Sequence, residues 1–394
     1  MFNGGAMRID VFCRVVDNYG DAGVTWRLAR QLAAEHAARV TLWIDAPRAL
    51  ARLAPRLDPH ADDATCDGVR VRRIDDDAIE IPALPDVVIE GFGCGLPPGY
   101  LQAMATASVQ PLWINLEYLS AEAWIESAHG LPSPHPRLPL TRYFFFPGFT
   151  RATAGLLREH DLFDRRGRAC AKTRRPFPAA IAPIVNGALG AAGGAAWAEP
   201  CVVSLFCYAN AALAPLLDAW AERDEPTLCL VPEGVATASF DRWLGGGVPH
   251  AGERITHGAL TLATMPFLAQ DDYDALLWSC DANFVRGEDS FVRAQWALAP
   301  FVWHIYPQED DAHRVKLDAF LDRYLADAPD DAAAACRGFW HTWNAGDALR
   351  VADGWVRFSA AMPALRAHDA RWVARLAAQP DLASQLWEFA RDRL

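Results

Sequence analysis

The 394-residue chain has no apolar run long enough to cross a membrane, since its apolar stretches, such as residues 87–89 and 301–303, are the size of single β-strands. A membrane-spanning helix needs about 20 consecutive apolar residues. Residues 1–6 also lack the basic segment and long apolar segment of an export signal, and Met7 is an alternative start. We therefore expect a cytoplasmic protein that does not contact the membrane.

Closely spaced cysteine and histidine ligands are also missing. The nine cysteines are scattered singly, without a C-x-x-C pair or the paired histidines of a zinc site. We expect reduced thiols, most of them packed as small apolar side chains. No metal ion and no bound cofactor are expected.

Positive charge is scarce, and the net charge of −12 argues against general nucleic-acid binding. The sequence contains no G-x-S-x-G motif, no phosphate-binding P-loop and no G-x-G-x-x-G fingerprint, so hydrolase, NTPase and dinucleotide-binding interpretations lack support. Residues 165–175 form a local basic run. We interpret it as a solvated loop, with a binding patch as the alternative.

The first half of the chain alternates apolar runs with amphipathic stretches. This alternation is typical of a parallel sheet covered by helices on both faces, a Rossmann-like arrangement. Strands are predicted at residues 8–16, 40–44, 69–74, 87–89 and 112–116, and helices at 24–35 and 98–107.

After a Pro-rich segment at 131–139 and a weakly periodic stretch at 165–194, the alternation restarts. Strands are predicted at 202–206, 227–231, 260–264, 282–285 and 301–304, and helices at 213–221, 272–279, 291–298 and 310–325. We predict an N-terminal domain at 1–180, a second Rossmann-like domain at 181–360, and final helices at 361–394 that pack back on the first. Tandem α/β domains facing a central cleft are typical of the GT-B glycosyltransferases.

The segment from Asp17 to Gly23 lies directly between a predicted strand and a predicted helix. Two carboxylates, Asp17 and Asp21, alternate here with glycine and asparagine, so a sharp turn can project both acids at a ligand. Carboxylates suit an acceptor that is cationic or must lose a proton. The alternative is a plain strand-to-helix turn in which Asp21 caps the helix.

A second polar cluster, Arg286, Glu288, Asp289 and Ser290 around Gly287, again joins a predicted strand to a helix. Backbone N–H groups at a helix N-terminus, a serine hydroxyl and an arginine are suited to binding a diphosphate. A simple helix cap by Asp289 or Ser290 is the alternative.

Aromatic and amide side chains follow predicted strands of the second half. Phe206, Tyr208, Phe267 and Gln270 can stack on a pyrimidine and bind its polar edge, although any one aromatic is more often part of the core. His304 and Gln308 follow another strand. They are candidates for a sugar or phosphate contact, and a histidine at the edge of the core is the favoured interpretation of His304.

Three segments form a recognisable set: VVDNYGDAGVTWRLAR at 15–30, RGEDSFVRAQWA at 286–297 and PFVWHIYPQ at 300–308. With them, the chain from about Met7 to its end resembles the EarP family, the elongation factor P arginine rhamnosyltransferases. The resemblance implies an inverting, metal-independent GT-B enzyme. Its donor would be dTDP-β-L-rhamnose, and its acceptor an arginine of elongation factor P, which then relieves stalling on polyproline.

The resemblance also implies roles for individual residues. Asp21 would be the catalytic base, and Asp17 and Glu288 further essential acids. The residues that would surround the donor are Asn18, Tyr19, Gly20, Phe206, Tyr208, Phe267, Gln270, Arg286, Glu288, Asp289 and Ser290. Two alternatives stay open: a nucleotide-sugar epimerase of the same fold, and a non-catalytic protein that binds a nucleotide sugar.

Overall fold

The computed structural model describes residues 6–16, 19–76, 81, 83–192, 199–247, 249–308 and 311–394. The chain divides into two compact units, unit 1 with residues Met1–Leu162 and Arg375–Leu394, and unit 2 with residues Phe163–Ala374. The sequence placed the divisions at 180/181 and 360/361 instead. The difference has a physical reason, because helices form at 162–192 and a single helix, α13 (Val351–Ala377), runs through position 360.

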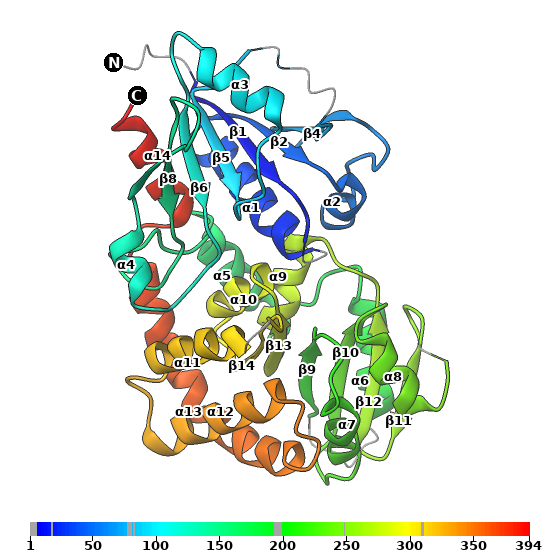
Figure 1. The fold of residues 1–394 in the computed structure, drawn as a ribbon. Helices are drawn as coiled ribbons and strands as arrows, with labels where there is room; N and C mark the ends of the chain where they lie inside the picture. The colour runs from blue at the N-terminus through cyan, green and yellow to red at the C-terminus, as the bar shows by residue number, and fades with distance from the viewer. Residues whose placement is uncertain are drawn as a thin grey trace. The chain divides into compact units, whose positions relative to one another are not determined.

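Unit 1 is built on an eight-stranded sheet with strand order β3-β4-β2-β1-β5-β6-β8-β7 (Figure 1). The central pairs are parallel, and antiparallel pairing occurs only where β3 and β7 close the two edges. The strands are β1 (Arg8–Cys13), β2 (Arg39–Ile44), β3 (Asp63–Cys66), β4 (Val69–Arg73), β5 (Val87–Gly91), β6 (Leu112–Leu116), β7 (Pro132–Pro134) and β8 (Thr141–Phe145).

Helices pack on this sheet through the apolar side chains that the sequence alternation places toward it. Trp26 and Leu28 of α1, and Tyr100 and Met104 of α3, are buried. The helices of unit 1 are α1 (Gly20–Glu35), α2 (Pro47–Leu53), α3 (Pro98–Thr106), α4 (Trp124–Ala128) and α14 (Leu382–Arg391).

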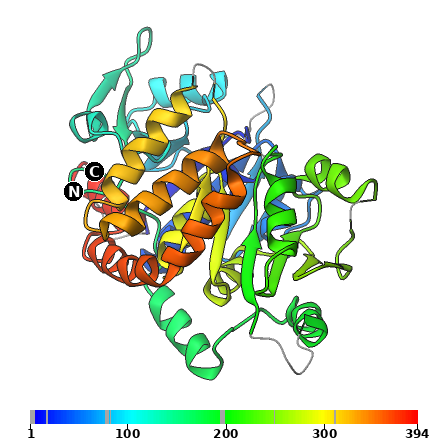
Figure 2. The same cartoon turned by 90° about the horizontal axis from the view of Figure 1, so that it is seen from below.

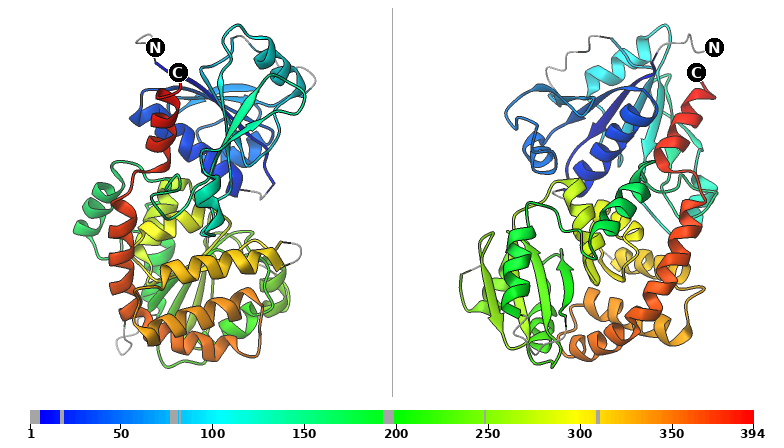
Figure 3. Two further views of the ribbon diagram at one scale, coloured as in Figure 1. Left: turned by 60° about the vertical axis from the view of Figure 1, so that its left-hand side comes forward. Right: turned by 180° about the vertical axis from the view of Figure 1, so that it is seen from behind.

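The last helix, α14, lies beside α1 within unit 1, as both views of Figure 3 show. The side chain of Asp381 caps α14 by accepting a hydrogen bond from the backbone N of Ser384 at 3.0 Å. The same carboxylate accepts a hydrogen bond from Gln31 of α1 at 2.9 Å, and the rings of Trp387 and His36 stack with centroids 5.2 Å apart. These contacts hold the end of the chain on the first sheet.

The Pro-rich segment at 131–139, which interrupts the predicted alternation, contains a short strand near its start. Pro132–Pro134 form β7, which pairs antiparallel with β8. Proline is tolerated here because β7 is an edge strand, where a missing N–H leaves no neighbouring carbonyl without a donor.

Unit 2 is built on a six-stranded sheet with strand order β11-β12-β10-β9-β13-β14, in which only the edge strand β11 is antiparallel. Its central strands are mostly apolar, and every residue of β10 and β12 is buried. The strands are β9 (Cys201–Leu205), β10 (Thr227–Pro232), β11 (Arg254–His257), β12 (Leu260–Met265), β13 (Ala282–Arg286) and β14 (Phe301–His304).

Most of the stretch at 165–192 is helical, although its sequence periodicity is weak. It contains α5 (Leu162–Lys172) and α6 (Ala182–Ala192). Val185 and Ala188 of α6, with Ile181 just before it, belong to a core cluster that includes Leu228 and Leu230 of β10. Their spacing of four and three residues forms one apolar helix face, which explains why this stretch joins unit 2.

The remaining helices of unit 2 are α7 (Leu213–Ala221), α8 (Thr237–Leu244), α9 (Gln270–Ser279), α10 (Asp289–Trp296), α11 (Ala312–Tyr324), α12 (Asp330–Asn344) and α13. Helices α11, α12 and α13 lie side by side (Figure 2). Aromatic rings pack between them. Phe320 stacks on Trp340, Tyr324 meets Trp372 edge-on, and Phe339 stacks on Phe358. No helix in the described part of the chain is long and apolar enough to cross a membrane.

The two Rossmann-like sheets that the sequence predicts are confirmed, and the strand order of each has the same consequence. In unit 1 the chain leaves β1 for β2 on one side and later returns to β5 on the other. In unit 2, β9 has β10 on one side and β13 on the other. Ligands of such sheets bind at these switch points, beyond the carboxyl ends of the strands. The segments after β1 and β5, and after β9 and β13, are therefore the places to look for a site.

Candidate active site

In unit 1 the predicted acidic segment follows β1. Asp17 and Asn18 lie outside the described residues. Helix α1 begins at Gly20, four residues before the position expected from the sequence, and Tyr19 is its N-cap residue. Asp21 therefore lies in the first helical turn, and the interpretation of Asp21 as the cap of the helix is wrong.

The Asp21 side chain is buried, with only 2% of its surface exposed, and both of its oxygens accept hydrogen bonds. Oδ2 accepts a hydrogen bond from the backbone N of Val16 at 2.8 Å, and Oδ1 accepts one from the Tyr118 hydroxyl at 3.2 Å. The first turn of a helix also favours negative charge, because the helix dipole points its positive end there. The site thus fixes an acidic group in one orientation at the end of β1.

Tyr19 and Gly20 start the same helix. The Tyr19 hydroxyl accepts a hydrogen bond from Arg52 Nη1 at 2.8 Å, and the Arg52 guanidinium carbon lies 5.8 Å from the centroid of the Tyr19 ring. The proposed contacts of Tyr19 and Gly20 with a donor stay predictions.

Sequence reasoning missed two aromatic residues of this site, Phe92 after β5 and Tyr118 after β6. Their rings stack with centroids 4.4 Å apart and planes 16° from parallel. Phe92 has a positive φ of 58°, which is unusual for a residue other than glycine. The sequence did contain a signal, because both residues lie within three positions of the ends of predicted strands at the same edge of a parallel sheet.

In unit 2 the turn between β13 and α10 contains the second predicted cluster. Gly287 takes a φ of 58°, Glu288 is the N-cap residue and Asp289 begins the helix. Ser290 Oγ accepts a hydrogen bond from the backbone N of Arg286 at 3.0 Å and also donates one to the Arg286 carbonyl. Ser290 thus closes the turn, and neither predicted capping role for Asp289 or Ser290 describes this geometry.

Arg286, Phe206 and Tyr208 come together at the switch point of unit 2. The guanidinium carbon of Arg286 lies 4.4 Å from the centroid of the Phe206 ring and 4.7 Å from that of Tyr208. Its Nη1 donates a hydrogen bond to the Cys207 carbonyl at 3.3 Å. A cation is thereby held over two aromatic rings at the end of β9.

Two further predicted residues lie at the start of α9, since Gln270 begins the helix and Phe267 lies three residues before it. Gln270 is buried and its Nε2 donates a hydrogen bond to Asp289 Oδ2 at 3.2 Å. The Phe267 and Phe206 rings meet edge-on with centroids 6.5 Å apart. Four of the residues predicted to surround the donor therefore form one connected group, because Arg286 lies over the Phe206 and Tyr208 rings and Phe267 meets Phe206. Gln270 and Asp289 form a hydrogen-bonded pair beside the turn.

His304 is a histidine at the edge of the core, as the sequence favoured. It is 5% exposed, and its Nδ1 accepts a hydrogen bond from the backbone N of Tyr208 at 3.3 Å. Burial, aided by the nearby Arg286 charge, lowers the pKa of His304 to about 3, so that the ring is neutral. Its neighbour Trp303, which sequence reasoning missed, donates an Nε1 hydrogen bond to the Gly287 carbonyl at 2.8 Å. Gln308 is exposed.

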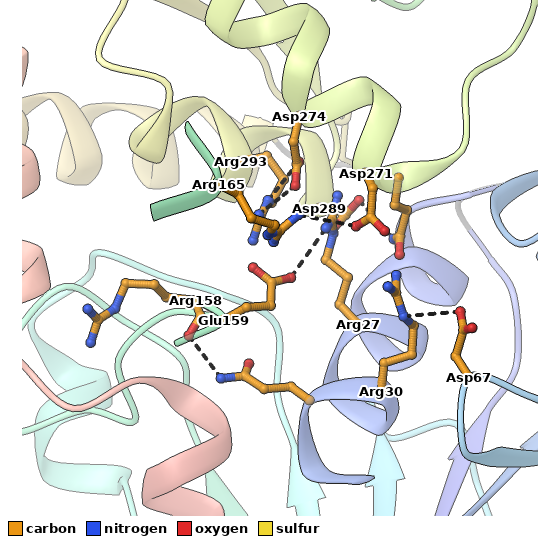
Figure 4. A network of polar contacts seen from close by, with 12 residues as sticks. Arg27, Arg30, Asp67, Arg158, Glu159, Arg165, Asp271, Asp274, Asp289 and Arg293 are labelled. Carbon is orange, nitrogen blue, oxygen red and sulfur yellow. Dashed lines mark hydrogen bonds and ion pairs between the residues drawn. The ribbon is translucent and has the colours of Figure 1, made fainter. Parts of the chain in front are cut away.

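An ion pair holds a helix behind each switch point (Figure 4). In unit 2, Arg293 of α10 makes two hydrogen bonds to Asp274 of α9, at 2.9 and 2.6 Å, and both side chains are 1% exposed. In unit 1, Arg27 Nη1 lies 3.4 Å from Glu159 Oε1. The first pair joins the helix that begins at the Arg286 turn to the helix that begins at Gln270.

The basic run at 165–175 lies mostly in helix α5 rather than in a loop, and its Arg165 and Arg175 are engaged within unit 2. Arg165 lies 3.6 Å from Asp271, and Arg175 lies 2.7 Å from Asp281 and also binds the Ser279 carbonyl. All nine cysteines are free thiols. In the described ranges no three His, Cys, Asp or Glu side chains gather as a metal-binding group, and metal independence stays an expectation.

The sequence matches known proteins over almost its whole length. The family model for "Elongation-Factor P (EF-P) rhamnosyltransferase EarP" matches residues 9–391. The protein-arginine rhamnosyltransferase of Pseudomonas putida is 49% identical over 389 residues, which are 98% of this chain and 99% of that protein. The protein-arginine rhamnosyltransferase of Neisseria meningitidis is 34% identical, with 96% of each chain covered.

Solved structures share the fold of this chain. A structure that describes EarP-mediated arginine glycosylation of translation elongation factor EF-P is 37% identical to this chain. It covers 98% of this chain and 100% of its own, with a TM-score of 0.66. The spinosyn rhamnosyltransferase SpnG, at 13% identity and a TM-score of 0.51, shares the fold alone. The fold is that of the GT-B glycosyltransferases.

Proposed function

Since the chain belongs to the EarP family of EF-P rhamnosyltransferases, we propose that it transfers L-rhamnose from dTDP-β-L-rhamnose to an arginine side chain of EF-P. The transfer inverts the configuration at the anomeric carbon, requires no metal ion and takes place in the cytoplasm. The modified EF-P then rescues ribosomes that stall on polyproline. Relatives that are named protein-arginine rhamnosyltransferases and aligned over nearly the whole chain support this proposal.

Arginine is a difficult acceptor, and this difficulty defines what the enzyme must provide. A guanidinium has a pKa above about 12 and delocalised lone pairs, so it is a poor nucleophile. The enzyme must hold the guanidinium in one orientation and remove a proton while the nitrogen attacks. The Asp21 carboxylate, buried and held through both oxygens, is the observation that carries the proposal.

The proposed reaction is a single displacement. A terminal guanidinium nitrogen attacks the anomeric carbon of rhamnose, the bond from that carbon to the oxygen of dTDP breaks, and the nitrogen loses its proton to Asp21. Asp17 is the second acid that would hold the guanidinium. Because no group of the enzyme forms a bond to the sugar, attack opposite the leaving dTDP inverts the anomeric centre.

The donor half of the proposal draws on the Arg286 cluster. A guanidinium and the N-terminus of α10 both favour a diphosphate, and they would stabilise the negative charge that develops on the departing dTDP. The Phe206 and Tyr208 rings offer faces for a pyrimidine. Arg286 lies over these rings, so the thymine would stack beside the guanidinium or displace it from the ring faces. Glu288, at the N-cap of α10, would contact the sugar or help to hold the acceptor.

Recognition of EF-P needs local features of the surface. The net charge of −12 gives no general attraction to an acidic partner, and long-range steering follows net charge. Local contacts must therefore select the acceptor arginine.

The test is intact-mass spectrometry of EF-P after incubation with this protein and dTDP-β-L-rhamnose, followed by peptide mapping. The expected result is a gain of one deoxyhexose on one arginine. The same gain should persist when the exposed Asp62 of unit 1, which lies 3.7 Å from Arg73, is replaced by Asn. Chelation of divalent metal ions should not reduce the gain.

Other outcomes separate the alternatives. Binding of dTDP-rhamnose without any modification of EF-P would contradict the acceptor assignment. Conversion of the nucleotide sugar into an epimer would identify an epimerase, and binding without turnover of any kind would identify a non-catalytic nucleotide-sugar-binding protein.

A further inference from the structure

The geometry points to Tyr118 as a positioning residue for Asp21 and as the aromatic face on which the acceptor guanidinium stacks, with Phe92 supporting the ring from behind. This inference rests on the proposed function and deepens it, because it assigns residues to the recognition of the arginine side chain. All of the residues involved lie in unit 1.

The arrangement starts at the buried carboxylate of Glu90, near the end of β5. Its Oε1 accepts a hydrogen bond from the backbone N of Gly95 at 2.9 Å, and its Oε2 accepts one from Trp113 Nε1 at 3.1 Å. Gly91 follows in tight packing, because a Cβ there would lie 2.8 Å from the Phe12 carbonyl oxygen. Glu90 and the close packing at Gly91 thus fix the path of the turn at 91–95.

This turn places Phe92 in a left-handed backbone conformation, with a φ of 58°. That conformation is unfavourable for a residue with a Cβ, and surrounding contacts must hold it. One such contact is the hydrogen bond from the backbone N of Phe92 to the Leu116 carbonyl at 2.6 Å. The conformation puts the Phe92 ring against the Tyr118 ring, with centroids 4.4 Å apart.

The Tyr118 side chain is constrained at two points and still accessible. One ring face lies on Phe92, and the hydroxyl donates a hydrogen bond to Asp21 Oδ1 at 3.2 Å. Tyr118 is nevertheless 39% exposed, which is high for a residue held in this way. The exposed surface of the ring therefore lies next to a carboxylate whose other oxygen is fixed by the backbone N of Val16.

An aromatic face beside a carboxylate is chemically suited to a guanidinium. The planar cation can stack on the ring while its N–H groups reach the acid at the ring's edge. A lysine ammonium has no plane to stack and no fork of donors. The arrangement therefore favours arginine over lysine, and it sets the guanidinium nitrogen beside the proposed base.

Two substitutions separate positioning from stacking. Tyr118→Phe keeps the ring and removes the hydrogen bond to Asp21, so kcat should fall roughly tenfold while KM for EF-P stays within about twofold. Phe92→Leu removes the support of the ring, so KM for EF-P should rise roughly three- to tenfold with a smaller change in kcat. Tyr143→Phe, at a tyrosine that packs on Phe389 of α14, is the control and should change neither value. Unchanged kcat and KM in both variants, or the same changes of kcat and KM in both, would overturn the inference.

A second experiment needs neither donor nor EF-P. The protein carries eight tyrosines, and 3-fluorotyrosine labelling lets Tyr118→Phe assign the Tyr118 resonance by its loss. Acetyl-arginine amide should shift that resonance, acetyl-lysine amide should shift it much less, and Asp21→Asn should move it without any ligand. An equal response to both amides, or none, would overturn the inference even if the wild type modifies EF-P. If the wild type modifies no EF-P, the proposed function fails, and the fluorine spectra still decide whether this face binds a guanidinium.

Discussion

The guanidinium carbon of Arg286 lies 4.4 Å from the centroid of the Phe206 ring, at the point where β9 and β13 of unit 2 end side by side. Tyr208 supplies a second ring at 4.7 Å, and the Cys207 carbonyl accepts a hydrogen bond from Nη1. The positive charge is therefore oriented before any donor binds, which reduces the entropy lost on binding a diphosphate.

Replacing Arg286 with Lys tests this orientation. Lysine keeps the charge but loses the planar fork that stacks and makes paired hydrogen bonds, so dTDP affinity should fall about tenfold. Isothermal titration with dTDP measures the change. Arg242→Lys, at an exposed arginine of α8 in the same unit, is the control and should leave dTDP affinity unaltered. Equal affinity of the Arg286 variant and the wild type would remove Arg286 from the donor site.

Ser290→Ala should weaken the turn that carries Arg286. The lost hydroxyl makes two hydrogen bonds to the Arg286 backbone, and their removal should cost about 1–2 kcal/mol of stability and also lower dTDP affinity. Thermal melts with and without dTDP measure both effects. A variant that loses affinity with an unchanged melting temperature would mean that Ser290 acts on the ligand directly rather than through the turn.

Asp274→Ala should destabilise unit 2 strongly. Arg293 would be left buried without its partner, at a cost of about 3–5 kcal/mol. Asp322→Ala breaks the exposed pair with Arg337 and should cost no more than about 1 kcal/mol. Similar losses in the two variants, measured by chemical denaturation, would contradict the importance assigned to burial.

Asp369 predicts a pH dependence of stability. Burial raises the pKa of Asp369 from 3.8 to about 7, so the folded state binds this proton more tightly than the unfolded state does. The stabilisation that protonation of Asp369 provides is fully present below the unfolded-state pKa of 3.8, and it is lost as the pH rises through the folded-state pKa of about 7. Asp369→Asn should therefore stabilise the protein by about 2–4 kcal/mol at pH 8, and by little near pH 4. Melting temperatures are measured across this pH range for Asp369→Asn and for the control Asp353→Asn, at an exposed position on the same helix. A gain in stability that did not depend on pH would contradict the account.

Much of the fold could be predicted because the buried central strands are mostly apolar. The predicted bounds of β6, α7 and β14 agree residue for residue with the structure. Helix α6 was missed because glycine and alanine weaken its pattern, although Ile181, Val185 and Ala188 keep helical spacing. What stabilises α6 is packing on β10 and β12, which no local pattern reports.

The candidate site could be predicted only where its residues cluster along the sequence. The Asp17–Asp21 and Arg286–Ser290 segments are each five consecutive residues, so their composition identified them. Phe92 and Tyr118 were missed because their stacking depends on a left-handed phenylalanine and on three strand ends meeting at one sheet edge. Likewise, the contact of Arg286 with Phe206 follows from strand order rather than from neighbouring sequence.

The most direct test of the central claim is a single-turnover measurement of rhamnose transfer to EF-P by Asp21→Asn, beside Asp62→Asn and the wild type. Asparagine keeps the size of Asp21 but cannot accept the proton. The account predicts that the Asp21 variant binds dTDP as the wild type does and transfers rhamnose about 10²–10⁴-fold more slowly, while the Asp62 variant is unaffected. A transfer rate within a few-fold of the wild type would show that Asp21 is not the base.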